Sequence, residues 1–352
     1  MTLAAQPDLG AFVQEAAQAG ELVVQPRMGM VSPEDMAAGV TAVADLPERT
    51  VATLTIDSYT RVGDHAAATE ALRTGRPLNG FPLVSHGPRT TARVASAAGR
   101  RTPVQVRHGS ADPMAIFRTM TAAGLAASEG GPVSYCLPYG RTPLAESVAA
   151  WRDSVQFLTE ESRNQGRRAH LESFGGCLLG QLCPPSLLVA VSVLECLFFA
   201  ANGATSVSLS YAQQTHAAQD AGALAALRRL ADELLPPTVD RHVVLYTYMG
   251  VYPRTVPGAR LLLRRSAELA VRGGAQRLIV KTETEAHRIP TVEENLTALR
   301  VAADAARAAR ARPHAAGPAG AVRRRPRAAL RRPVRHRRHP GDARRPRTVR
   351  LQ

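Results

Sequence analysis

The sequence has little lysine, cysteine or aromatic character. Of its 44 basic residues all but Lys281 are arginine, so Lys281 either meets a need for a compact, flexible ammonium group or is a chance survivor of a GC-rich coding bias. The four cysteines show neither C-x-x-C spacing nor a matching histidine cluster, which argues against a structural zinc site. We therefore expect a reduced, cytoplasmic setting. The chain does not open with a charged segment followed by an apolar one, so we expect no secretion signal.

Long apolar runs are also missing. The most apolar stretch, 187–201, is interrupted by Glu195 and is shorter than the ~20 residues that span a bilayer. We therefore predict a buried helix at this position and no membrane segment.

Acidic residues almost disappear from the last part of the chain. The formal net charge is +15, and most of it falls within 312–352, where Asp342 is the only acid among many arginines. The body before this tail is nearly neutral. The tail has too few apolar residues to fold, so we predict that it is disordered. Its Arg-, Pro- and Ala-rich text is typical of a shifted reading frame in a GC-rich gene, and we interpret it as a frameshift product rather than a selected feature.

The basic tail allows a second function class, which is non-specific nucleic-acid binding. A run of arginines would bind phosphate with a steep salt dependence. However, 312–352 contains no aromatic residues between the arginines, and no recognition fold is evident. Nucleic-acid binding is therefore the alternative and not our first hypothesis.

Short strand-like runs alternate with helix-like runs before the tail, which indicates a parallel sheet with helical crossovers. Eight such strands close into a (β/α)8 TIM barrel of ~250 residues. A doubly wound open sheet stays possible, but the G-x-G-x-x-G turn that it usually carries is missing. We count eight or nine strands, and the surplus one would be 22–24 or 125–128. The strand candidates are 22–24, 50–56, 78–87, 103–106, 125–128, 169–176, 204–212, 242–253 and 277–291.

The helix signals are strongest where a cap or an amphipathic pattern is present. Ser32 followed by Pro33 predicts a helix that begins at Pro33, with the Ser32 side chain as its N-cap. A short helix is expected within 1–20, an amphipathic one over 151–166 and a last one up to residue 311. We therefore divide the chain into an N-terminal helix (1–20), a barrel domain (21–311) and the tail (312–352).

Charged and aromatic residues fall at the predicted carboxyl ends of the strands, which meet at one mouth in a barrel. Three arginines at one mouth favour an acidic substrate with more than one carboxylate, because a guanidinium group binds a carboxylate through two parallel hydrogen bonds. The alternative is that each arginine forms a solvated salt bridge, and that Arg107 and Glu129 are an ordinary surface pair. The strand-end residues are Arg27, Arg61, Asn79, His86, Arg107, Glu129, Glu172, Tyr211, Tyr252 and Lys281.

Several motifs within 21–311 together resemble one family, the large catalytic subunit of methylaspartate mutase, also called glutamate mutase. Any one motif would be weak, but their combination is specific. The motifs are QPRMG (25–29), TIDSYTR (55–61), LNGFPLVSHG (78–87), VQVRHG (104–109), EGGPVSY-x-LPY (129–139), LCPPS (182–186), Asp220, GVYP (250–253) and KTETEAHRIPT (281–291).

The resemblance implies a TIM barrel that works with a small cobalamin-binding subunit, with the large subunits forming a homodimer. The implied reaction is the interconversion of L-glutamate and threo-3-methyl-L-aspartate, so the protein would be an isomerase, of the intramolecular transferase type. The implied cofactor is adenosylcobalamin, which supplies a 5′-deoxyadenosyl radical, while the protein binds, orients and shields the substrate. No metal ligand from this chain is implied, and no membrane is involved.

The resemblance also assigns roles to residues that match the family motifs. Glu129 would bind the substrate amino group and act on its proton. The substrate carboxylates and the rest of the substrate pocket would be bound by Arg27, Arg61, Arg107, His108, Tyr135 and Tyr139. The adenosylcobalamin side would be lined by Gly29, Asn79, Pro138, Tyr252, Lys281, Glu285 and Ile289.

Three departures from the family pattern stand out. Leu171 occupies the position before Glu172 where the family usually has an arginine, and the role of the segment 177–182 is uncertain. The family chain continues well beyond the last helix, where this one has the basic tail. The cobalt-ligating D-x-H-x-x-G motif of the small subunit is absent here, because Asp240-Arg-His242 continues as Val-Val-Leu, so cobalamin should need a partner. A further alternative is an inactive, truncated barrel remnant.

Overall fold

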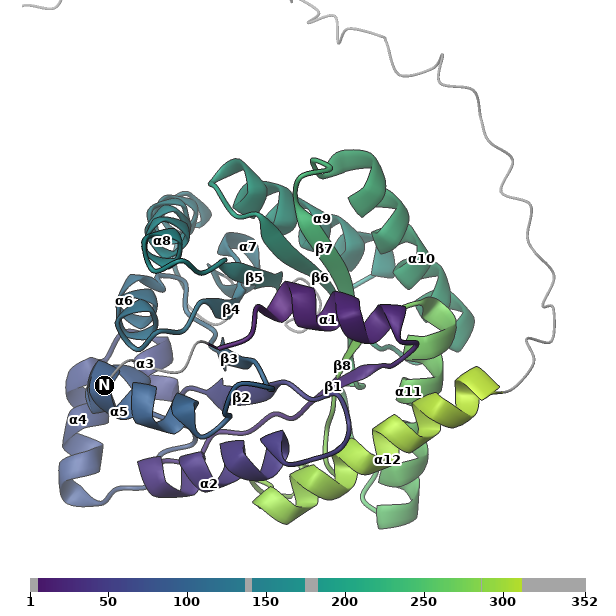
Figure 1. The fold of residues 1–352 in the computed structure, drawn as a ribbon, viewed down its shortest axis with the longest axis horizontal. Coiled ribbons are helices and arrows are strands. Elements are labelled where there is room, and N and C mark those ends of the chain that lie inside the picture. Colours follow the sequence, from purple (N-terminus) through teal and green to yellow (C-terminus); the bar gives the residue numbers. More distant parts are fainter. Residues whose placement is uncertain (1–5, 137–140, 175–182, 286, 312–352) are drawn as a thin grey trace, which may run out of the picture. The chain divides into compact units, whose positions relative to one another are not determined.

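The computed structural model describes residues 6–136, 141–174, 183–285 and 287–311. Eight strands form one sheet in the order β1-β8-β7-β6-β5-β4-β3-β2, and every neighbouring pair is parallel. A parallel bridge between Val24 and Thr50 brings the first strand beside the second, so the sheet closes on itself (Figure 1). The predicted (β/α)8 barrel is confirmed. The strands are β1 (Val23–Gln25), β2 (Ala52–Thr55), β3 (Val104–Arg107), β4 (Ala127–Gly130), β5 (His170–Ser173), β6 (Ser206–Ala212), β7 (Asp240–Tyr246) and β8 (Arg277–Ile279).

Helices lie between successive strands and surround the barrel (Figure 1). The predicted cap is present, because the Ser32 hydroxyl accepts a 3.0 Å hydrogen bond from the Asp35 N–H. The helices are α1 (Leu9–Gln18), α2 (Pro33–Ala44), α3 (Ser58–Arg61), α4 (His65–Thr74), α5 (Leu83–Ser96), α6 (Met114–Ala122), α7 (Pro132–Cys136), α8 (Leu144–Asn164), α9 (Pro185–Ala201), α10 (Ala217–Leu234), α11 (Val256–Gly273) and α12 (Val292–Ala311).

The strand predicted over 78–87 is wrong, whereas both segments suspected of being surplus, 22–24 and 125–128, contribute to strands. Phe81 makes only an isolated bridge to Ile56, and α5 begins at Leu83. Proline at position 82 has no N–H for a sheet ladder. Phe81 and Leu83 are apolar because both are fully buried in the core, and this burial does not require a strand.

The prediction of a buried helix over 187–201 is only partly right. Helix α9 packs one face on the barrel, but Leu187 and Leu194 are 45% and 60% exposed on its outer side. An outer helix of a barrel has only one face to bury. Among the described helices, none is both long and apolar enough to cross a bilayer.

Alternate residues of each strand face the two sides of the barrel wall. The outward side chains, such as Leu54, Val106, Leu171 and Leu209, join the helices in the main apolar core. The inward side chains are largely polar and fully buried: Gln25, Thr53, Gln105, His170, Glu172, Ser206, Ser208 and Arg277. Leu171 therefore belongs to the outer core and faces away from the barrel interior.

Helix α1 covers the amino-terminal end of the barrel (Figure 1). Its residues Phe12 and Val13 pack with Val23, Val51 and Ala127, which lie at or just before strand starts. This end of the barrel is therefore closed, and the opposite end is left for a site. The division at residues 20 and 311 stays a prediction, and 312–352 lies outside the described residues.

Candidate active site

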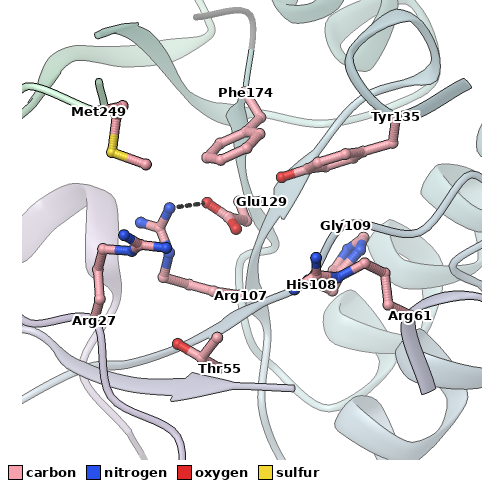
Figure 2. A pocket seen from close by; sticks show the side chains of 10 residues that line it. All are labelled: Arg27, Thr55, Arg61, Arg107, His108, Gly109, Glu129, Tyr135, Phe174 and Met249. Carbon is pink, nitrogen blue, oxygen red and sulfur yellow. Dashed lines mark ion pairs between the residues drawn. The ribbon is translucent and has the colours of Figure 1, made fainter. Parts of the chain in front are cut away.

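A cavity of about 130 Å³ lies at the carboxyl ends of the strands. Four charged side chains surround it, three of them arginines, together with aromatic and small residues. Figure 2 draws Arg27 and Arg107 on one side of Glu129, and Arg61 with His108 on the other. The lining consists of Arg27, Thr55, Arg61, Arg107, His108, Gly109, Glu129, Tyr135, Phe174 and Met249.

Arg107 and Glu129 form a buried ion pair at the ends of β3 and β4. The Arg107 Nη2 atom lies 2.6 Å from Glu129 Oε2, and the two side chains are only 4% and 3% exposed. The reading of this pair as an ordinary surface salt bridge is therefore wrong. Nη1 of Arg107 is buried and has no hydrogen-bond partner in the part of the chain that the structure describes. Because an unsatisfied buried donor is costly, this atom is poised to bind an anion in the cavity.

Arg61 reaches the cavity from the short helix α3. The Asp57 carboxylate caps this helix by accepting hydrogen bonds from the N–H groups of Tyr59 and Thr60, at 2.9 and 3.1 Å. Gly109 leaves room for the arginine, since a Cβ there would lie 3.0 Å from Arg61 Cδ. The buried Nε of Arg61 also forms no hydrogen bond with any described residue.

His108 is a neutral hydrogen-bond donor toward the cavity. Burial, reinforced by Arg61 and Arg107, lowers the pKa of His108 to about 3. Its Nδ1 accepts a hydrogen bond of 3.1 Å from the Ser110 N–H, so the single proton of the neutral ring is on Nε2. Nε2 has no partner in the described residues. Trp151 stacks on the ring with centroids 5.7 Å apart and fixes its orientation.

Glu129 is the group in this pocket that can exchange a proton near neutral pH. Burial raises its pKa to about 7, Arg107 opposes the shift, and the nearby Glu172 carboxylate adds to it. A carboxyl group with such a pKa is suited to general acid–base work. Glu129 therefore combines the position and the proton affinity that a catalytic acid or base needs.

A second cluster adjoins the cavity beyond Arg27. Arg27 Nη1 lies 2.9 Å from Glu285 Oε2, and Lys281 Nζ lies 3.9 Å from the same oxygen. The Lys281 ammonium also sits 4.6 Å from the centre of the Tyr252 ring. The Tyr252 hydroxyl is buried and has no hydrogen-bond partner among the residues that the structure describes. The structure thus brings together Tyr252, Lys281 and Glu285, which the sequence assigned to one side of the site.

Of the other predicted cofactor residues, the three that the structure describes, Asn79, Ile289 and Gly29, do not belong to this cluster. Asn79 Oδ1 accepts a 2.9 Å hydrogen bond from the Ser58 N–H, and Ile289 is exposed. Gly29 is required by packing, because a Cβ would lie 2.3 Å from the Thr55 carbonyl oxygen. Pro138 and Tyr139, like the segment 177–182, lie outside the described residues.

Two of the strand-end residues lie elsewhere in the fold. The Tyr211 side chain faces outward into the apolar core and donates a 2.8 Å hydrogen bond to Asp220 Oδ1. His86 belongs to α5 and contacts the Val31 carbonyl oxygen at 2.9 Å. Four residues that line the cavity were not predicted from the sequence: Thr55, Gly109, Phe174 and Met249. Each lies within a few positions of the end of a predicted strand.

The charges of the pocket are suited to a small anion with more than one negative group. Arg107 Nη1, Arg61 Nε and His108 Nε2 are three buried donors that make no hydrogen bond within the described residues, and all three residues line the same cavity. Guanidinium groups favour carboxylates. Glu129 could pair with an ammonium group on the same molecule. An amino dicarboxylate matches this set of charges.

The fold and the pocket define a TIM-barrel protein with an arginine-lined cavity at the carboxyl ends of its strands. Comparison with known proteins adds the family. The family model for the methylaspartate mutase E chain (MutE) matches residues 4–313, and this chain belongs to that family.

Curated relatives described as glutamate mutase epsilon subunits support this assignment. The protein from Haloarcula marismortui is 33% identical over 295 residues, which cover 82% of this chain and 60% of the relative. The protein from Halobacterium salinarum is 34% identical over 298 residues, with 82% and 61% covered. The one from Desulfitobacterium hafniense is 33% identical over 290 residues, with 80% and 59% covered. This chain therefore spans about 60% of the length of the relatives that it matches.

Proposed function

We propose that this chain acts as the catalytic subunit of a glutamate mutase, an isomerase that interconverts L-glutamate and threo-3-methyl-L-aspartate. The observation that carries the proposal is one cavity in a member of this family, where three buried donors without a hydrogen bond among the described residues surround Glu129. The substrate has two carboxylates and one ammonium group, and the cavity offers three arginines and one carboxylate. The charges of substrate and pocket are thus complementary.

In this proposal the two sides of the pocket each bind one carboxylate. Arg27 and Arg107 hold one, and Arg61 with the Nε2–H of His108 holds the other. Glu129 pairs with the ammonium group and, with a pKa of about 7, takes and returns its proton. Tyr135 lines the cavity, and we assign Tyr139 to the same substrate pocket from the family motif alone. Fixing both ends of the substrate holds its carbon skeleton in one orientation during rearrangement.

The proposed cofactor is adenosylcobalamin, bound where Tyr252, Lys281 and Glu285 meet. These residues fit a large polar group, because the buried Tyr252 hydroxyl makes no hydrogen bond to a described residue and the two charged side chains lie beside it. When bound, the cofactor would supply the radical that removes a hydrogen atom from the substrate. The remaining residues proposed for this side are Gly29, Asn79, Pro138 and Ile289.

The proposal includes partners. The relatives are named as epsilon subunits, which supports an enzyme of several subunits. We propose a small cobalamin-binding subunit as the partner, a homodimer of this chain, and a cytoplasmic location.

Calorimetric titration of the full chain with L-glutamate tests the substrate assignment. L-Glutamine lacks the side-chain carboxylate and 4-aminobutyrate lacks the α-carboxylate, so each leaves one side of the pocket unfilled. We expect L-glutamate to bind at least about 10-fold more tightly than either compound, because each loses charge-assisted hydrogen bonds. Equal affinities for the three compounds would exclude a pocket built for two carboxylates.

A further inference from the structure

Beneath the substrate cavity, the barrel interior holds three fully buried polar residues that the proposed reaction does not use. Glu172 comes from β5, Tyr246 from β7 and Arg277 from β8. Each is inaccessible to solvent, and none of them lines the cavity. Burying two charges and a phenol in a barrel core is costly unless all are paired, so their arrangement calls for an explanation.

Arg277 is held from several directions. Its guanidinium group bonds the carboxylate of Glu172 and the side-chain oxygen of Gln25. It also donates to Ser208 Oγ at 3.1 Å and to Gln105 Oε1 at 3.0 Å. Such a fully satisfied guanidinium cannot move away without breaking the network. Arg277 therefore fixes the Glu172 carboxylate in one position.

Glu172 is linked through Tyr246 to the ion pair of Arg107 and Glu129. The Tyr246 hydroxyl contacts Glu172 Oε1 and lies 3.2 Å from Glu129 Oε2. The Tyr246 ring also lies against the Arg107 guanidinium, whose Cζ is 5.0 Å from the ring centre. Arg107 Nη1 is 3.8 Å from Glu172 Oε1. Tyr246 and Glu172 thus each contact Arg107, and Tyr246 bridges the two carboxylates.

We propose that Tyr246 and Glu172, anchored by Arg277, are positioning residues that hold Arg107 and Glu129 in place and set the proton affinity of Glu129. This inference rests on the proposed function, since it concerns the group that would exchange a proton with the substrate. The three residues act from below the cavity, through Arg107 and Glu129, and do not touch the substrate themselves.

The network shifts the pKa of Glu129 in two opposite directions. The Glu172 carboxylate is a nearby negative charge and raises the pKa of Glu129. The Tyr246 hydroxyl has a single proton that its contacts share between Glu172 and Glu129, and the share that reaches Glu129 stabilises the ionised form and lowers its pKa. Burial opposes ionisation of Glu172, but Arg277 and Arg107 offset it, and the pKa of Glu172 lies below its usual value. Glu172 therefore stays ionised while Glu129 titrates. The charged and titratable groups facing Glu129 are Arg27, Arg107, Glu172 and Tyr246.

The test measures the pKa of Glu129 directly in the full chain without any ligand. NMR of chain labelled at the carboxyl carbons of its glutamates gives the titration curves, and Glu129→Gln identifies the Glu129 signal by its loss. We expect Tyr246→Phe to raise the titration midpoint of Glu129 and Glu172→Gln to lower it, each by at least about 0.5 pH unit. Tyr246→Phe keeps the ring that packs on Arg107, so it removes only the hydroxyl.

Two further variants keep the test interpretable. Glu172→Gln leaves Arg277 as a buried cation without its partner, so the double variant Glu172→Gln with Arg277→Met is measured beside it and should also lower the midpoint. Tyr211→Phe is the matched control, because it removes a buried phenol that bonds a carboxylate on the outer side of the wall. In Tyr211→Phe the titration midpoint of Glu129 should equal that in the unaltered chain.

Unchanged midpoints, or shifts in the same direction for Tyr246→Phe and Glu172→Gln, would overturn the inference and leave the network with a structural role only. The proposed function is judged separately, by L-glutamate binding to the unaltered chain. Opposite shifts in a chain that does not bind L-glutamate would support the network and reject the substrate.

Discussion

Arg107 Nη2 and Glu129 Oε2 lie 2.6 Å apart at the ends of neighbouring strands, and both side chains are buried. Without a ligand these two groups neutralise each other. An amino acid carries both charges that they need, since its carboxylate can pair with Arg107 and its ammonium group with Glu129. Binding would then exchange one internal ion pair for two pairs with the ligand, so that no charge is left unpaired in the cavity.

The first prediction concerns the shape of the Arg107 side chain. Arg107→Lys keeps the positive charge but loses the planar fork, so L-glutamate should bind about 10- to 100-fold more weakly, as expected for lost hydrogen bonds to a charged group. Calorimetry measures the affinity. Arg49→Lys is the control, because Arg49 forms an exposed ion pair with Glu21. The Arg49→Lys chain should bind L-glutamate as tightly as the unaltered chain. An Arg107→Lys chain that binds as tightly as the unaltered one would remove Arg107 from the binding site.

The second prediction follows from the raised pKa of Glu129. Its pKa is about 7 in the folded state and near 4.5 when exposed in the unfolded chain. Between these values the folded state holds a proton that the unfolded state has lost. Glu129 therefore adds stability below about pH 4.5 that disappears as the pH rises through 7, by up to about 3 kcal/mol.

Chemical unfolding at several pH values measures this effect. Between pH 5 and 8 the free energy of unfolding should fall less in Glu129→Gln than in the unaltered chain. The difference between the two decreases should be on the order of 3 kcal/mol. Glu195 has a pKa raised by burial to about 7 as well, so it contributes to the slope with the same sign in both chains. If the free energy of unfolding changes equally with pH in the two chains, Glu129 does not titrate between pH 5 and 8.

The third prediction concerns Glu195, a buried residue of α9 that links helix α7 to the segment after β5. Its carboxylate accepts hydrogen bonds from the N–H groups of Val133, Ser134 and Phe174, at 3.2, 2.8 and 3.3 Å. Glu195→Ala removes these three hydrogen bonds, so the free energy of unfolding should fall by about 3 kcal/mol or more. Glu233→Ala, an exposed change on α10, should stay within about 0.5 kcal/mol of the unaltered chain. A similar, small loss for both variants would argue against this account of Glu195.

The fourth prediction separates the barrel from the basic tail. Deleting 312–352 should abolish any binding of the chain to RNA, because the tail carries most of the net positive charge. L-Glutamate affinity should be the same with and without the tail. Filter binding at low salt measures the first effect and calorimetry the second. RNA binding that persists in the shortened chain would assign a nucleic-acid surface to the barrel itself.

The sequence predicted the barrel and the lining arginines for one physical reason. Strand ends are visible as apolar runs that stop at Gly or Pro, and parallel strands bring these ends to one mouth. Arg27, Arg61, Arg107 and Glu129 were therefore placed in one site without knowledge of the structure. The same reasoning failed for His86, because the apolar segment 78–87 is buried as a loop and the start of α5.

The supporting network could not be predicted in this way. Strands of a barrel are buried on both faces, so their sequences do not show which residues face inward. Tyr211 and Tyr246 occupy similar places in two neighbouring strands, yet the side chain of Tyr211 faces the helices and that of Tyr246 faces Glu129. Arg277 looked like an ordinary strand start. Only the three-dimensional register shows its pairing with Glu172.

The central claim is that this barrel catalyses the rearrangement of glutamate. The direct measurement is chromatographic detection of 3-methylaspartate formed from L-glutamate by the full chain, mixed with a cognate small cobalamin-binding subunit and adenosylcobalamin. A glutamate mutase epsilon subunit assayed in parallel shows that the partner is competent. We predict product above the level of the small subunit alone, and its loss in Arg107→Lys. No product from this chain beside an active parallel sample would contradict the claim.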